Sequence, residues 1–322
     1  MDSTAHRIRS AVAFLWDTNK PLTFVGLLMI GALAAALVGL AVDPRTITGM
    51  PAWLKPAKFA ASTAIYSLTL AWVFSYLPNW PATRRWVGWM TAAIFVGEVA
   101  LINLQAWRGT SSHFNVGTPL DAVIFATMGL GILVQTISSI FVVVALWRER
   151  FGDDVVAWAL RLGMTITLLG AATGPLMTQP TAAQLAEARV THRMPIAGAH
   201  TVGAPDGGPG LPGTGWSREH GDLRVPHFLG LHALQVLAIV AIALRRFRPR
   251  AATPAAIGLA AICYVALFGI LMWQALRGES IVAPGAATLT VLAVWLAATA
   301  FTAFAAVGRT ATRGASAAAL IA

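Results

Sequence analysis

Eight apolar stretches dominate this sequence, and each is long enough to cross the hydrocarbon core of a lipid bilayer. That core is about 30 Å thick and takes about 20 helical residues to span. Lipid cannot satisfy backbone hydrogen bonds, and the stretches lack the alternating pattern of barrel strands. We therefore predict an all-α polytopic membrane protein with about eight transmembrane helices, at residues 22–42, 59–77, 86–107, 120–147, 156–178, 225–244, 254–276 and 283–307.

The charged residues support this interpretation and suggest an orientation. They make up 11% of the 322 residues, whereas soluble domains contain about a quarter. In an eight-span arrangement most Lys and Arg residues fall on one side, which the positive-inside rule assigns to the cytoplasm. We expect both termini to be cytoplasmic, in a bacterial inner membrane. The net charge of +10 is then a topology signal, and its spread over separate loops argues against nucleic-acid binding.

Two distant segments resemble each other at a constant offset. The sequence QAWRGTS at 105–111 matches QALRGES at 274–280, and KPAKF at 55–59 matches RVPHF at 224–228. An even number of helices in each copy gives both copies the same orientation. We predict a 4+4 parallel internal repeat with four-helix copies at 21–150 and 151–308, preceded by a cytoplasmic lead-in at 1–20 and followed by a cytoplasmic tail at 309–322.

A long Gly- and Pro-rich segment separates the predicted fifth and sixth helices. It covers residues 179–223 and lies on the extracytoplasmic side of the predicted topology. Its glycines Gly208, Gly210 and Gly213 match a dinucleotide-binding spacing, but Pro209 and Pro212 exclude the helix that such a motif requires. We predict that this loop forms a compact, irregular extracytoplasmic cap over the helices.

Histidines gather on the same predicted side. Imidazole is a common ligand of Cu, Fe and Zn, so a metal site is one interpretation, with the candidate ligands His113, His192, His200, His227 and His232. A b-type haem is another, with His227, His232 and Arg224 as cofactor-binding residues. The lone Cys263 excludes a thiolate cluster. The alternative is that these histidines only order the cap through hydrogen bonds.

Charged residues near the predicted membrane boundary form a second candidate set. Glu98 lies well inside an apolar stretch, where an ionised carboxylate is costly unless it is paired or protonated. Together with Asp121, Arg108 and Arg277 it forms the predicted catalytic set. Guanidinium groups recognise carboxylate or phosphate, and Lys55 would add positive charge at the same boundary.

Three functions are compatible with these patterns. The first is a membrane-embedded, metal- or haem-dependent oxidoreductase with its site at the extracytoplasmic face. The second is a transporter or channel for a small anion or organic acid along the repeat interface, which the duplication favours. The third is an accessory membrane subunit that docks a periplasmic partner. The predicted partners are the lipid bilayer, a small anionic or lipid-soluble substrate and a second copy of the chain.

Overall fold

The computed structural model describes the backbone of residues 2–319 and the side chains of residues 4–304. Within this part of the chain, seven helices are long and apolar enough to cross a membrane, or eight if one bent helix pair forms a single span. The prediction of an all-α polytopic membrane protein is confirmed at this level. Residues 320–322 of the predicted tail lie outside the described residues.

The chain divides into two compact units. Unit 1 comprises Met1–Glu149, Gly174–His200 and Ala204–Ser217, and unit 2 comprises Arg150–Thr173, Thr201–Gly203 and Arg218–Ala322. The segment predicted as a cap is therefore shared between the units. Each unit is described separately below.

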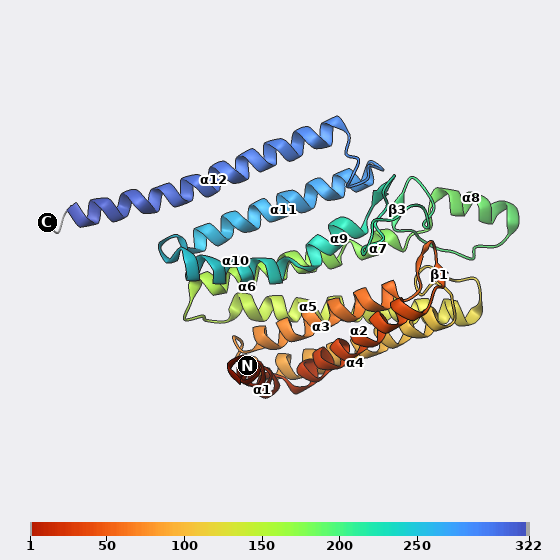
Figure 1. Cartoon of the computed structure of the whole chain (residues 1–322), viewed down its shortest axis with the longest axis horizontal. Helices are drawn as coiled ribbons and strands as arrows, with labels where there is room; N and C mark the ends of the chain where they lie inside the picture. Colours follow the sequence, from red (N-terminus) through yellow and green to blue (C-terminus); the bar gives the residue numbers. More distant parts are fainter. Residues whose placement is uncertain (1, 320–322) are drawn as a thin grey trace. The chain divides into compact units, whose positions relative to one another are not determined.

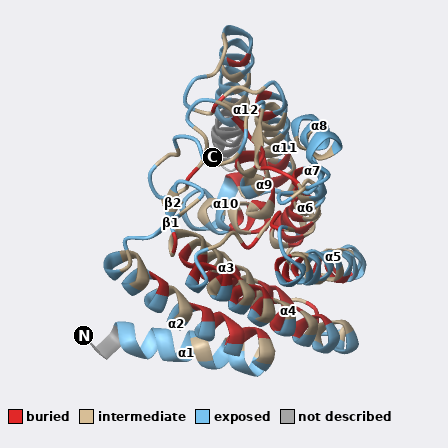
Figure 2. Ribbon diagram, turned by 90° about the vertical axis from the view of Figure 1, so that its right-hand side faces the viewer, coloured by how far each residue is buried: buried red, intermediate tan, exposed pale blue. Residues whose placement is uncertain are grey.

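Unit 1 contains five long helices, which Figure 1 draws in red to yellow-green. They are α1 (Asp2–Thr18), α2 (Lys20–Val42), α3 (Leu54–Phe74), α4 (Pro81–Trp107) and α5 (Pro119–Arg148). Helix α2 packs against α3 and α4, and α4 packs against α5. Figure 2 shows buried residues along α3 and α4. Val25, Met29, Ala64, Phe95 and Val99 belong to this core, whereas many large apolar side chains on the outer faces are exposed, as lipid contact requires.

A short hairpin connects α2 to α3. Strands β1 (Thr46–Ile47) and β2 (Met50–Pro51) pair antiparallel, and both residues of the turn, Thr48 and Gly49, have positive φ angles. A two-residue turn of this kind matches the twist of its strands. A Cβ on Gly49 would lie 2.7 Å from the carbonyl oxygen of Gly207, so the hairpin tip rests directly on the Gly-rich loop of unit 1.

The segment predicted as an irregular cap is partly helical. It follows the single turn α7 (Gly174–Met177) and contains α8 (Ala182–Thr191). Helix α8 begins with a capping box, in which Thr181 and Gln184 each accept a hydrogen bond from the other's backbone N–H. It ends at His192, which adopts the left-handed conformation. The prediction of an irregular segment at 179–223 is corrected for Ala182–Thr191, which form this helix.

Unit 2 is built on the contacts of α6. Its elements are α6 (Asp154–Ala171), α9 (Arg224–Leu231), α10 (Ala233–Phe247), the 3₁₀ turn η1 (Pro249–Ala251), α11 (Pro254–Leu276) and α12 (Ala286–Ala319). Strand β3 (Thr201–Val202) pairs antiparallel with β4 (Gly221–Asp222) just before α9. Helix α6 packs against α9, α10 and α11, and α12 packs against α11. Helix α12 extends into the predicted tail, through residues 309–319.

Two predicted spans differ from the helices observed. The stretch 225–244 is not one straight helix, because α9 and α10 meet at an angle of 48°. The backbone N–H of His232 bonds to Phe228 and Leu229 carbonyls, which tightens the last turn of α9 before the bend. The stretch 156–178 ends its first helix at Ala171. There a Cβ on Gly170 would meet the backbone of Gly230, so α6 and α9 touch main chain to main chain.

Candidate functional site

The candidate histidine ligands are distributed over both units. Among the described residues, no three His, Cys, Asp or Glu side chains lie close enough together to hold one metal ion. His113, His192 and His200 belong to unit 1, whereas His227 and His232 belong to unit 2. The described residues therefore contain no cluster of three candidate ligands that would support a bound metal ion.

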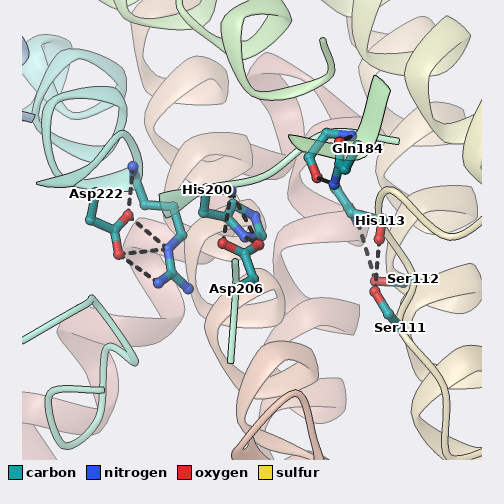
Figure 3. Close-up of polar contacts among 9 residues, drawn as sticks. Ser111, Ser112, His113, Gln184, His200, Asp206 and Asp222 are labelled. Carbon is teal, nitrogen blue, oxygen red and sulfur yellow. Dashed lines mark hydrogen bonds and ion pairs between the residues drawn. The ribbon is translucent and has the colours of Figure 1, made fainter. Parts of the chain in front are cut away.

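In unit 1, His113 lies in an aromatic cluster. Its ring is 5.7 Å from that of Phe59 and 6.4 Å from that of Phe125, measured between centroids. The hydroxyl of Ser112 is 3.2 Å from His113 Nδ1 (Figure 3). Phe114 packs against both His113 and His200, so the two imidazoles share an aromatic neighbour.

His200 forms a carboxylate–imidazole pair. Its Nδ1 lies 2.7 Å from Asp206 Oδ2, and its backbone N–H also donates to the Asp206 carboxylate (Figure 3). Such a carboxylate fixes the tautomer and orientation of an imidazole. His192 has a different role, because it is exposed and ends α8.

In unit 2, His227 is held by the end of α6. Its Nδ1 lies 2.9 Å from both the Gly170 carbonyl oxygen and the Thr173 hydroxyl. A carbonyl only accepts, so Nδ1 carries the proton. His232 lies at the bend between α9 and α10 and packs on the ring of Phe228, 4.3 Å away. Arg224 forms a two-pronged ion pair with the buried Asp222 (Figure 3).

The end of α4 carries a buried polar cluster. Gln105 is fully buried, and its Nε2 donates to Asp121 Oδ1 at 2.8 Å and to the Ser111 carbonyl at 3.3 Å. Arg108 Nη1 bonds to both Gln105 and Asp121, at 2.5 and 2.7 Å. Asp121 also accepts from Thr118. The carboxylate thus joins the end of α4 to the first turn of α5, and Arg108 and Asp121, two members of the predicted catalytic set, are in contact.

The end of α11 has the same local arrangement. Gln274 is buried and donates from Nε2 to the Ser280 carbonyl at 2.8 Å. Gly278 has a φ of 75°, close to the 74° of Gly109. Arg277 bonds to Glu279, and Glu279 accepts from Thr288 in the first turns of α12. In both units a buried Gln donates to a carbonyl in the turn that follows its helix. A carboxylate bound to the neighbouring Arg also accepts a hydrogen bond from a Thr at or near the start of the next helix.

The two glutamines give a matched prediction. Gln105→Leu and Gln274→Leu each remove one of the hydrogen bonds to a carbonyl oxygen, Ser111 or Ser280, and the loss of one such bond costs about 0.5–1.5 kcal/mol. Gln105 also bonds to Asp121 and Arg108. We expect Gln105→Leu to lower the free energy of unfolding in detergent more than Gln274→Leu does. Equal losses would show that the Asp121 cluster adds no stability through Gln105.

Glu279 predicts a pH dependence. Hydrogen bonds from Thr288, Arg277 and the Gly285 backbone lower its pKa from 4.5 to about 2. A carboxyl whose folded pKa is depressed adds stability above its unfolded pKa and loses it as the pH falls. We expect the connection between α11 and α12 to lose protection against hydrogen exchange between pH 4.5 and about 2. Glu279→Gln should remove this pH dependence; an unchanged profile in the variant would contradict the assignment.

Glu98 is the most unusual charged residue of unit 1. It lies on α4 inside a candidate span, is 4% exposed, and its Oε2 has no hydrogen-bond partner among the described residues. Its Oε1 faces Gly131 of α5, where an added Cβ would come within 3.3 Å. The ammonium group of Lys55, in the first turn of α3, acts electrostatically on this carboxylate. Lys55 also lies over the Phe59 ring.

Further buried polar side chains lie on α4 and α5, on the far side of Glu98 from the Asp121 cluster. The sequence-based candidate sets contained only charged residues and histidines, so they omitted these side chains. Thr91 lies two turns from Glu98 on one face of α4, and Gln135 lies one turn beyond Gly131 on α5. Both are buried, and their side-chain oxygens lack hydrogen bonds among the described residues. The Tyr66 hydroxyl is 3.4 Å from the Ser139 hydroxyl. The signal was present in the sequence, because these polar residues recur at helical spacing within apolar stretches.

An apolar layer lies between Glu98 and the Asp121 cluster. Ile102, Ile124 and Met128 are buried together, with Phe59 packed against them. Ile102 falls between Glu98 and Gln105 on α4, and Ile124 and Met128 fall between Asp121 and Gly131 on α5. The facing helices thus present a charged cluster at the end of α4, an apolar layer and then a buried carboxylate.

The fold and these residues define a class: a multi-pass α-helical membrane protein that keeps a buried carboxylate inside one of its helical units. Comparison with protein-family models, with curated proteins and with solved structures gives no match to this chain. The functional argument therefore depends on the residues themselves.

Proposed function

We propose that the protein transports a small anion or organic acid across the membrane together with a proton, and that Glu98 carries the proton. The observation that carries this proposal is the carboxylate of Glu98, buried in a candidate span with one oxygen that lacks a hydrogen-bond partner among the described residues. Intramembrane carboxylates are rare because of their cost, and they mark ion pathways and proton relays.

The neighbours of Glu98 suit a step that alternates between charge states. The ammonium group of Lys55 stabilises the ionised form of the Glu98 carboxylate electrostatically. When Glu98 is protonated it is neutral and no longer requires this positive partner. The apolar layer of Ile102, Ile124 and Met128 separates Glu98 from the Asp121 cluster. If this apolar layer opened, the Glu98 carboxylate would be connected to the end of α4. If the layer closed, the carboxylate would be isolated from that end.

Positive groups at the end of α4 and the start of α3 suit an anionic substrate. Arg108 is partly exposed, and its side-chain hydrogen bonds to Gln105 and Asp121 both come from Nη1, so Nε and Nη2 would be the donors to a bound anion. Lys58 donates to the Thr214 carbonyl, and Lys55 lies one turn before it. Guanidinium and ammonium groups recognise carboxylates and other small anions.

The finer points of topology are also proposals. The matched hydrogen bonds of Gln105 and Gln274, and the similar φ angles of Gly109 and Gly278, support duplication of a four-helix unit. The concentration of Lys and Arg supports cytoplasmic termini in a bacterial inner membrane. In that orientation the ends of α4 and α11, the hairpin β1–β2 and helix α8 face the extracytoplasmic side.

The test is uptake into proteoliposomes. The purified chain is reconstituted, a proton gradient is imposed, and the entry of chloride, nitrate and short-chain carboxylates is measured one at a time. We expect one of these anions to enter with co-transported protons, detected by an internal pH dye. A gradient that drives neither anion entry nor proton entry would overturn the proposal.

A metal- or haem-dependent oxidoreductase is the second candidate, and one observation favours it. His227 donates from Nδ1 to the Gly170 carbonyl, and metal-bound histidines usually donate their other ring N–H to such a group. Nε2 of His227 would then be the ligand atom. Absorption spectra of oxidised and reduced protein, with elemental analysis, test the oxidoreductase proposal. A Soret band, or bound Cu, Fe or Zn that is lost in His227→Ala, would support it.

The docking of a periplasmic partner and the formation of homo-oligomers are further predictions from the sequence, and they stay predictions.

A further inference from the structure

Helix α1 crosses the direction of the other helices of unit 1. Figure 1 views α1 nearly end-on while α2 to α5 run across the picture, and Figure 2 shows α1 along its length. Its apolar side chains are not fully covered, since Ile8 is 60% exposed, Phe14 50% and Trp16 38%. At 100° per residue, Arg7 and Arg9 lie on either side of Ile8. On the same wheel Phe14 lies about 120° to one side of Ile8, near Arg7, and Trp16 lies about 80° to the other side, near Arg9. Exposed apolar and basic side chains therefore alternate over one broad face of the helix.

The corner between α1 and α2 is fixed to α4. Asn19 is buried and caps α2 by accepting the Leu22 N–H. Its Nδ2 donates to the Arg84 carbonyl at 3.0 Å, and Arg84 Nη2 donates to the Thr18 carbonyl at 2.9 Å. A Cβ on Gly88 would lie 2.7 Å from the Asn19 side chain. These contacts hold α1 across the ends of the bundle.

The same end of unit 1 carries exposed tryptophans and basic residues. Trp86 and Trp89 are 46% and 63% exposed at the start of α4, and Trp147 is 44% exposed at the end of α5. The Trp86 ring packs on Phe141 with centroids 5.4 Å apart, which brings the start of α4 to the last turns of α5. The basic residues at this end are Lys20, Arg84, Arg85 and Arg148. Tryptophans and cations in this arrangement mark a membrane–water interface.

We propose that α1 lies in the plane of the membrane surface and, with this basic end of unit 1, binds anionic phospholipid headgroups. Exposed apolar side chains also occur on α2 beyond the corner, at Phe24, Leu27 and Leu28. Apolar residues of an interfacial helix enter the boundary of the acyl chains while its basic flanks meet lipid phosphates. Charge favours an anionic surface, because among the described side chains of this corner Asp17 is the exposed acid, against Arg7, Arg9, Lys20 and Arg85. The inference does not depend on the proposed transport.

Lipid binding to the full-length chain provides the first test. Native mass spectrometry of detergent-purified protein titrated with phosphatidylglycerol should show tighter binding than with phosphatidylcholine. Each basic residue adds about 1 kcal/mol near an anionic surface, so the Arg9→Gln/Arg85→Gln variant should bind phosphatidylglycerol about tenfold to thirtyfold more weakly.

The matched control is Arg189→Gln/Arg193→Gln, which removes the same charge from exposed positions in and just after α8. It should bind as the unaltered chain does. Equal losses in the two variants would overturn a site at the α1 corner, and so would full competition by inorganic phosphate, because a free anion would then suffice.

The depth of α1 provides the second test, in reconstituted full-length protein with Cys263→Ala. Spin labels at Ile8→Cys and His6→Cys lie on opposite faces of the helix. The label at position 8 should collide with oxygen dissolved in lipid, and the label at position 6 with a water-soluble nickel chelate. Nickel access at both positions would overturn the proposal, and protection of position 8 from both reagents would show a protein partner in place of lipid.

Discussion

Glu98→Gln is expected to abolish proton-driven anion uptake while the protein stays folded. The substitution keeps the size and shape of the side chain but removes its ability to gain and lose a proton. Glu98 is 4% exposed and lacks a partner for Oε2 among the described residues. A neutral amide is less costly than a carboxylate in that position. We therefore expect equal or higher thermal stability in detergent together with loss of uptake.

The matched control is Glu187→Gln on α8. It makes the same chemical change at an exposed position of the same unit, so it should leave both uptake and stability unaltered. Glu98→Asp is a further comparison, because it keeps the carboxylate but withdraws it by one methylene. Uptake that persists in Glu98→Gln with its dependence on the proton gradient would assign Glu98 a purely structural role.

Hydropathy and charge predicted the helical membrane fold because each span must satisfy its backbone internally and contact lipid externally. Helix α8 was missed, although Thr181 and Gln184 have the spacing of a capping box. The polar composition of its surroundings favoured a loop instead. The capping box is a local signal, and it could have been recognised from the sequence.

The bend at His232 and the partners of the charged residues required the structure. The bend depends on how α9 meets α6 at Gly230, and no local sequence rule encodes that contact. Glu98 was recognised from its place in an apolar stretch, but the electrostatic effect of Lys55 depends on how α3 packs beside α4. The histidines were grouped by predicted membrane depth. Depth alone does not bring side chains together, and the described residues contain no three-ligand cluster.

Gly170→Ala is expected to destabilise unit 2 strongly for a single added methyl group. A Cβ at this position would overlap the backbone of Gly230 and Leu231, and backbone atoms cannot rotate away as a flexible side chain can. Overpacking of a tight contact costs about 1–3 kcal/mol. Gly170→Val should cost more, because the two helices must separate further. The same separation should lengthen the contact between His227 Nδ1 and the Gly170 carbonyl.

Gly258→Ala and Gly269→Ala are the matched controls on α11, because a Cβ at either position meets no heavy atom within 4 Å. Alanine is more favourable than glycine in a helix by about 1 kcal/mol, so these variants should be neutral or slightly more stable. The measurement is the free energy of unfolding of each variant in detergent. Because Gly163 also approaches the backbone of Leu234, Gly163→Ala should resemble Gly170→Ala. Four variants of equal stability would mean that α6 does not depend on close main-chain contact with α9 and α10.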